Sequence, residues 1–160
     1  MNITQSIAIV SLVRDGDYNA GFTADSFDMS QWNHCAILMA GDSSVATDST
    51  MIVYGGATAA AVTAAITAPF RWTAVATGTT ASDVWGAWQT AVASFTLTAA
   101  SLASGYSLII EFDASDLNIS GTQYRYVTPV IPASGSAGTV NMWAILTEPR
   151  VQKDILATTV

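Results

Sequence analysis

Few side chains in this sequence could carry out acid–base, nucleophilic or metal chemistry. Its 160 residues include one histidine (His34), one cysteine (Cys35), one lysine (Lys153) and two glutamates (Glu111 and Glu148). General acid–base and nucleophilic catalysis draw mainly on such groups. An enzyme would therefore have to be built around His34, the only imidazole. A catalytic role would be indicated by an open cleft in which acidic side chains converge on this histidine.

We expect His34 and Cys35 to be structural residues instead. They begin the run 34–40, which is typical of a buried strand. Adjacent side chains of a strand point to opposite faces, so the two residues cannot form a nucleophile–base pair. Buried cysteine packs as a small apolar side chain, and a strand histidine satisfies its ring with a hydrogen bond. We predict that the protein is not an enzyme, that it has no catalytic, cofactor-binding or metal-binding residues, and that it uses no cofactor.

The aspartates occur mainly in pairs at predicted turns. These pairs are Asp15/Asp17, Asp25/Asp28, Asp42/Asp48 and Asp113/Asp116. Because aspartate closes Asx-turns, capping of turns is the main interpretation. Asp15-Gly16-Asp17 resembles part of a calcium loop, although the EF-hand spacing with its terminal glutamate is absent. A calcium ion in a loop, or two carboxylates flanking a sugar as in glycoside hydrolysis, are the alternatives.

The tryptophans allow two interpretations. Tryptophan is enriched in protein interfaces and also fills cores, which is the interpretation we favour. The same indoles could instead form a sugar-stacking platform in a lectin-like sandwich. The residues concerned are Trp32, Trp72, Trp85, Trp88 and Trp143.

Charge and composition exclude some partners and favour others. The net charge is −7, and the four arginines and one lysine are scattered, whereas nucleic-acid binding needs clustered basic residues. We therefore expect no nucleic-acid and no anionic membrane partner. Charged residues make up 11% of the chain, against about 25% in ordinary globular proteins. A neutral surface suits a protein whose flanks are covered by neighbours, because burying uncharged groups avoids the desolvation of ions.

Length and the N-terminal sequence suggest one domain made in the cytosol. A chain of 160 residues can bury a sufficient core, and a single cysteine cannot form an internal disulfide. The N-terminus has no basic residue before its apolar run, and no stretch has the roughly 18 uncharged apolar residues of a membrane span. The low charge described above, taken alone, favours a component of an oligomer or lattice.

Alternation with a period of two and β-branched residues predict an all-β fold. The expected strands, separated by turn residues, are 3–13, 25–29, 34–40, 49–54, 69–75, 91–98, 106–113, 123–131 and 139–146. Eight or nine short antiparallel strands are typical of a β-sandwich or jelly roll. We predict one such domain over residues 1–148, followed by a C-terminal tail, residues 149–160, that contacts a partner.

Three segments carry more specific expectations. In the first strand, Ile3, Ile7, Ile9 and Val13 should share one face. The Ala/Thr-rich segment 57–67 mixes helix-forming and strand-forming residues and is expected to be a short helix or an irregular loop. Ser82 and Asp83 could cap one helical turn that places two tryptophans, three positions apart, on one side.

From residue 106 onward the chain resembles the C-terminal half of small structural proteins of tailed bacteriophages. In these proteins an Ile-Glu-Phe-Asp-like strand is followed by an Asp-Leu turn, a Tyr/Val-rich strand, a Gly/Ser loop and a closing strand that ends in Pro-Arg or Arg-Tyr. The matching stretches here are 108–113 (LIIEFD), 116–118 (DLN), 124–130 (YRYVTPV) and 142–150 (MWAILTEPR). The segment 25–34 (DSFDMSQWNH) is similar to their strand entry.

The resemblance covers about half of the chain and implies a virion protein. It suggests a head decoration (cement) protein that forms an oligomer, often a homotrimer, and binds the major capsid protein on the capsid exterior after synthesis in the host cytoplasm. The family offers no catalytic residues to carry over. We expect the N-terminal strand and the tail to make the contacts between subunits, because chain ends exchange between protomers at little cost. The alternative is a carbohydrate-binding β-sandwich of a tail or host-recognition protein.

Overall fold

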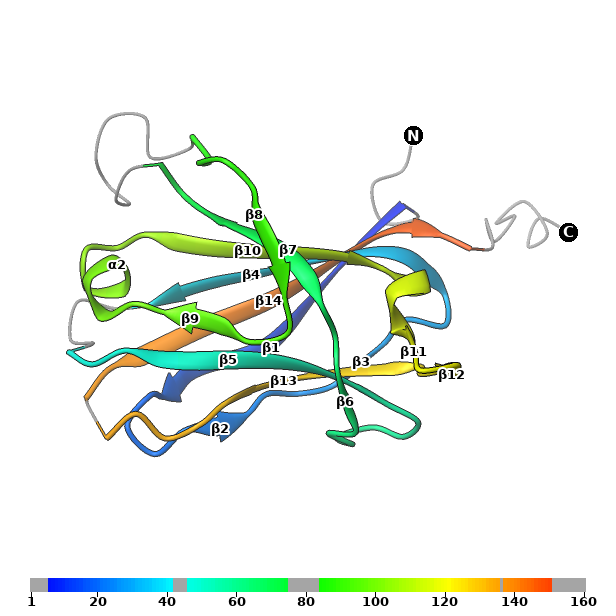
Figure 1. The fold of residues 1–160 in the computed structure, drawn as a ribbon, viewed down its shortest axis with the longest axis horizontal. Helices are drawn as coiled ribbons and strands as arrows, with labels where there is room; N and C mark the ends of the chain where they lie inside the picture. The colour runs from blue at the N-terminus through cyan, green and yellow to red at the C-terminus, as the bar shows by residue number, and fades with distance from the viewer. Residues whose placement is uncertain (1–5, 42–45, 75–83, 136, 151–160) are drawn as a thin grey trace, which may run out of the picture.

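Two antiparallel β-sheets packed face to face form the protein (Figure 1). The computed structural model describes residues 6–41, 46–74, 84–135 and 137–150. Sheet I has the order β1-β14-β4-β10-β7-β8. Its strands, in that order, are Ile7–Asp17, Thr139–Pro149, Trp32–Gly41, Ser107–Asp113, Ala68–Trp72 and Gln89–Val92.

Sheet II is built around two longer strands. Its order is β2-β13-β5-β6, where β3 also pairs with β13 and β9 with β5. These strands are β2 (Phe22–Thr23), β3 (Phe27–Asp28), β5 (Ser49–Gly56), β6 (Ala64–Ala65), β9 (Phe95–Leu97) and β13 (Tyr126–Ile131). A helix of five residues, α2 (Ala99–Ala103), a 3-10 turn, η1 (Ala114–Leu117), and a small hairpin of β11 (Asn118–Ile119) and β12 (Thr122–Gln123) complete the described fold.

The path of the chain is that of a jelly roll, one of the two architectures expected for eight or nine short strands. Strands β1, β4, β10 and β14 belong to sheet I, and the chain passes through sheet II between successive members of this set. The neighbours β14, β4 and β10 are therefore far apart in sequence but adjacent in space. Nine of the described strands have three or more residues, which matches the expected eight or nine. The predicted all-β sandwich is confirmed.

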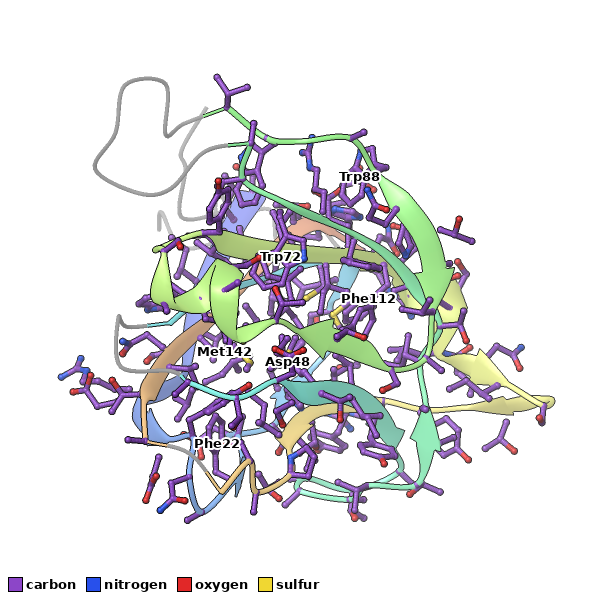
Figure 2. All side chains as sticks on the ribbon, turned by 60° about the vertical axis from the view of Figure 1, so that its left-hand side comes forward. Phe22, Asp48, Trp72, Trp88, Phe112 and Met142 are labelled. Carbon is purple, nitrogen blue, oxygen red and sulfur yellow. The ribbon has the colours of Figure 1, made fainter. Side chains whose placement is uncertain are left out.

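Alternating side chains fill the space between the sheets. In β4, Cys35, Ile37 and Met39 are fully buried, and the residues between them point to the outer face. Strands β10 and β14 follow the same pattern, so that Phe112 and Met142 lie between the two layers (Figure 2). From sheet II, Met51, Val53, Phe95, Leu97 and Val127 close the core.

The first strand differs from the expected pattern because it contains bulges. Register shifts fall between Ser11 and Val13 and between Val13 and Gly16. A bulge adds a residue to one strand and changes which face the following side chains occupy. Ile7 and Ile9 lie opposite outward residues of β14, whereas Val13 lies opposite the buried Met142. The prediction that Ile7, Ile9 and Val13 share a face was therefore wrong; Ile3 is outside the described residues.

Three local expectations also need correction. Segment 57–67 is mostly an irregular loop, which was one of the two alternatives, but its residues Ala64–Ala65 form strand β6, which pairs with β5. The predicted strand 91–98 is divided between β8 in sheet I and β9 in sheet II, and the helix that follows, α2, was not predicted. The predicted helical turn before β8 is instead extended where it is described, and Trp85 forms a bridge to Thr73. Ser82 and Asp83 lie outside the described residues.

The described chain ends within sheet I. Pro149 is the last residue of β14 and lies opposite Trp32. Arg150 donates its backbone N–H to the carbonyl oxygen of Gln31 and its Nε–H to Oδ1 of Asn33, at 2.9 and 3.1 Å. Pro149, the first residue of the expected tail, is thus part of the sheet, and Arg150 is bonded to the segment that enters β4. Residues 151–160 lie outside the described residues.

Candidate functional site

The outer face of sheet I carries a row of cross-strand neighbours whose three central members, on β14, β4 and β10, are apolar. Through the strand pairings, Ser11 of β1 lies opposite Trp143 of β14, Trp143 opposite Leu38 of β4, Leu38 opposite Ile109 of β10, and Ile109 opposite Arg71 of β7. Trp143, Leu38 and Ile109 are only half-buried, because no described element covers this face. We call the row Trp143–Leu38–Ile109 the apolar row.

A second row runs beside the first and extends the apolar surface. Ile9 of β1 lies opposite Ile145 of β14, Ile145 opposite Ala36 of β4, and Ala36 opposite Glu111 of β10. Ile9 is 69% exposed, the highest value among the large exposed hydrophobic residues of the described chain. Neighbouring apolar side chains on an uncovered sheet face are a candidate contact surface.

Charged side chains gather at one end of this face. Nδ1 of His34 lies 2.8 Å from Oδ1 of Asp113, which is its direct cross-strand neighbour. Nε2 of His34 lies 3.7 Å from Glu111, and the other carboxylate oxygen of Glu111 lies 3.9 Å from Arg71. The sheet register therefore builds a chain of alternating acidic and basic side chains across β10, β4 and β7. Period-two alternation predicted which faces these side chains occupy, but not which strands are neighbours.

Two tryptophans pack against Arg71 at the edge of the charged chain. The guanidinium carbon of Arg71 lies 4.3 Å from the ring centroid of Trp88 and 5.4 Å from that of Trp85. Such cation–π contacts contribute about 0.5–1 kcal/mol at exposed sites. Trp88 remains 43% exposed and points away from the core (Figure 2). The two tryptophans were predicted to lie on one side of a helical turn. They do lie together, but the described residues 84–88 form no helix.

His34 lies in an open hollow of about 360 Å³ with acidic side chains around it. The hollow is lined by His34, Glu111, Asp113, Asp116, Trp88, Pro69 and Phe112. Part of the arrangement that would indicate catalysis is therefore present. The two nearest acids face opposite ring nitrogens, however, and Glu111 is shared with Arg71. Among the described residues, His34 makes no hydrogen bond to a hydroxyl or thiol that it could activate.

Cys35 points away from His34, as expected from strand geometry. Its side chain is fully buried between the sheets, and burial raises the pKa of the thiol well above its ordinary value. The thiolate is the reactive form of cysteine, so this thiol is unreactive in the folded protein. The predicted placement of the two side chains on opposite faces of β4 is confirmed.

Several of the paired aspartates cap turns. Asp17 accepts the N–H groups of Asn19 and Ala20, and Asp48 accepts the N–H of Ala99 at the start of α2. Asp116 accepts the N–H of Asp113 in a capping box of η1. Within the described ranges, no group of three or more His, Cys, Asp or Glu residues is arranged to hold a metal ion. Asp42 lies outside those ranges.

Asp28 has a further role, because it forms a bidentate ion pair with Arg125. Nε of Arg125 lies 3.0 and 2.9 Å from the two carboxylate oxygens, and the N–H of Ser30 also donates to Asp28. The guanidinium hydrogen bonds lower the pKa of Asp28 from 3.8 to about 2. The pair joins β3 to the segment that enters β13.

We expect Asp28→Asn to destabilise the protein at neutral pH but not in strong acid. A carboxyl whose pKa is lower in the folded state stabilises that state above its unfolded pKa, and this contribution is lost as the pH falls from about 4 to about 2. Urea unfolding of wild type and variant at pH 7, 3 and 2 measures the difference. Asp25→Asn is the control, because the Asp25 carboxylate makes no hydrogen bond to the described residues. If the free energies of unfolding of wild type and Asp28→Asn differed as much at pH 2 as at pH 7, the ion pair with Arg125 would not be the source of the stabilisation.

The five tryptophans divide between the core and the outer face. Trp32 and Trp72 pack against the core, as expected for a sandwich. Trp143 belongs to the apolar row, whereas Trp85 and Trp88 contact Arg71. The core interpretation is therefore confirmed for two of them, and the other three are placed where a partner or ligand could reach them.

The comparisons with known proteins give one distant structural match. No family model and no curated protein matches the sequence. The fold is similar to the crystal structure of the SPBc2 prophage-derived protein YomS, with a TM-score of 0.41 and 9% sequence identity over 89% of this chain and 93% of that chain. A likeness of this degree leaves function to be argued from the surface itself. No helix among the described residues is long and apolar enough to cross a membrane.

Proposed function

We propose that this protein is a structural component of a phage particle, a decoration (cement) protein that binds the major capsid protein on the exterior of the head. The observation that carries the proposal is the apolar row on the uncovered outer face of sheet I. The sequence resemblance of segments 108–118, 124–130 and 142–150 supports the virion class. The protein acts by contact, not by catalysis, and it self-associates on the head surface.

The size of the face is sufficient for this role. Six strands spaced about 4.8 Å apart, with about seven residues each at about 3.3 Å, give roughly 650 Å² of face. Stable protein–protein interfaces bury about 800 Å² per partner. The face of sheet I and its rim can therefore form one interface of ordinary size. Burial of apolar area stabilises a complex by about 25 cal/mol per Å², and repeated contacts over a shell add together.

Co-sedimentation tests the proposal directly. The purified protein is mixed with capsids assembled from the major capsid protein encoded in the same genome, and bound protein is separated by centrifugation. We expect saturable binding, and we expect decorated capsids to resist heating or mechanical rupture better than bare capsids. A protein that stays in the supernatant with both immature and expanded capsids would contradict the proposal.

Carbohydrate recognition by a tail or host-recognition protein is the second candidate function. The hollow beside His34 favours it, since an exposed indole next to carboxylates can stack on a sugar ring and bind its hydroxyl groups. Titration with glycans while tryptophan fluorescence is recorded tests this candidate. A change that Trp88→Ala abolishes would support glycan binding, whereas a capsid-binding protein should show no change.

A further inference from the structure

Strand β1 has an open edge, where backbone groups of residues 7–11 face no other described strand. Strand β1 is the first strand of sheet I and pairs along its length with β14 on one side. On the other side, the described backbone contact is the N–H of Asp25, which donates to the carbonyl oxygen of Leu12. Residues 7–11 therefore have no second strand beside them among the described residues. Unpaired edges of this kind readily accept another strand.

Residues 7–11 also lack the features that protect exposed edges. Natural edge strands are short, or they carry charges, proline or bulges. The bulges of β1 begin after Ser11, and the sequence has no charged side chain before Arg14. Residues 7–11 read Ile-Ala-Ile-Val-Ser, without proline or glycine. Ile9, at the centre, is 69% exposed.

We propose that β1 pairs with β1 of a second copy of this chain, antiparallel and centred on Ile9, to form a two-fold dimer. In this register Ile9 faces its own counterpart, Ile7 faces Ser11, and Ala8 faces Val10. The segment is thus complementary to itself, as a two-fold interface requires. Each chain has a net charge of −7, yet residues 7–11 bring no like charges together.

The other sheet edges are less suited to this pairing. At the far edge of sheet I, β8 has only four residues, and a register shift separates its pairs with β7. At the edges of sheet II, the described strands have two or three residues. Pairing of β1 with β8 of a neighbour would also be head-to-tail, which produces rings or fibres instead of a closed pair.

The pairing would join the contact surfaces of the two copies. Ile9 lies next to Ile145 on the outer face of sheet I. Across the two-fold axis, Ile145 and Ile9 of one copy would continue into Ile9 and Ile145 of the other, so that the apolar surface runs from one copy to the next without interruption. This dimer rests on the proposed function, because it specifies how the protein self-associates. The dimer is tested with the isolated protein and capsid binding is tested by co-sedimentation, so either result can be negative without the other.

Crosslinking of Ile9→Cys with a short bismaleimide tests the proposal. Directly opposed residues of paired strands have Cβ atoms about 4.5–5.5 Å apart, within reach of the reagent. The native Cys35 is buried and does not compete. We expect most of the variant to become a covalent dimer, and we expect Thr90→Cys, at the centre of β8, to give none. Failure of Ile9→Cys to crosslink, or efficient crosslinking of Thr90→Cys, would overturn the pairing.

Sedimentation equilibrium supplies a second measurement. We expect wild-type protein to be a dimer and Ile9→Lys, which places like charges opposite each other, to weaken dimerisation at least 100-fold. Leu38→Lys, on the same face but away from the edge, should remain a dimer. A monomeric wild-type protein, or a trimer unaffected by Ile9→Lys, would overturn the proposal.

Discussion

Replacement of Phe95 by alanine is expected to lower the free energy of unfolding by about 3–5 kcal/mol. The Phe95 ring is fully buried and meets Phe70 edge to face, with the ring centroids 5.7 Å apart. It therefore connects β9 of sheet II to β7 of sheet I. Because β9 has three residues and forms a short ladder with β5, few backbone hydrogen bonds hold it in place. The total stability of a domain is about 5–15 kcal/mol, so the loss is a large fraction of it.

Thermal unfolding of Phe95→Ala measures this effect. For a chain of this length we expect a lower midpoint, by about 6–20 °C. Thr96→Ala is the matched control, since Thr96 is the exposed residue next to Phe95 on the same strand, and its free energy of unfolding should change by no more than about 0.5 kcal/mol. Equal effects of the two substitutions would show that Phe95 does not anchor β9 in the core.

The central strands could be predicted because their alternation is regular. In β4 and β10, every second residue is apolar and faces sheet II, and no glycine or proline interrupts either strand before Gly41. The burial of Cys35 and the outward direction of His34 follow from this period alone. The turns could be predicted for a similar reason, since the Asp side chains bond to backbone groups close by in sequence.

The elements that the sequence did not predict depend on distant contacts. Nothing local to β1 shows that Val13 lies past a bulge, because the bulge is defined by the register with β14, more than 100 residues away. The extended path through Trp85 follows from its bridge to Thr73 and from the cation of Arg71. Local propensity cannot supply such contacts, and tertiary structure overrides it.

The candidate site could be predicted only in part for the same reason. Both faces of β4 are apolar, since Ala36 and Leu38 point outward while Ile37 and Met39 point inward. A sequence of this kind is typical of a strand buried on both faces, and it gives no sign that one face is uncovered. The neutral composition predicted a surface covered by neighbours, and this stays a prediction. The alignment of Trp143, Leu38 and Ile109 required the strand order.

Leu38→Lys is expected to abolish binding to capsids while the protein remains folded. Leu38 lies at the centre of the apolar row, between Trp143 and Ile109. Burying an ammonium group in an apolar interface costs several kcal/mol, and every 1.4 kcal/mol is a factor of ten in affinity. We therefore expect affinity to fall by more than about 100-fold. In the free protein the side chain is half-exposed, so the lysine can reach water and unfolding should change by at most about 1 kcal/mol.

The matched control for this experiment is Thr50→Lys, which adds the same charge to β5 of sheet II at a half-buried position. Its binding to capsids should equal that of the wild type. If Thr50→Lys abolished binding and Leu38→Lys did not, the capsid contact would lie on sheet II and the outer face of sheet I would have another role. Leu38→Lys is also expected to remain a dimer, because the β1 edge is not altered. Loss of capsid binding by a variant that still dimerises would therefore separate the two surfaces, with the apolar row contacting the capsid and the edge of β1 contacting a second copy.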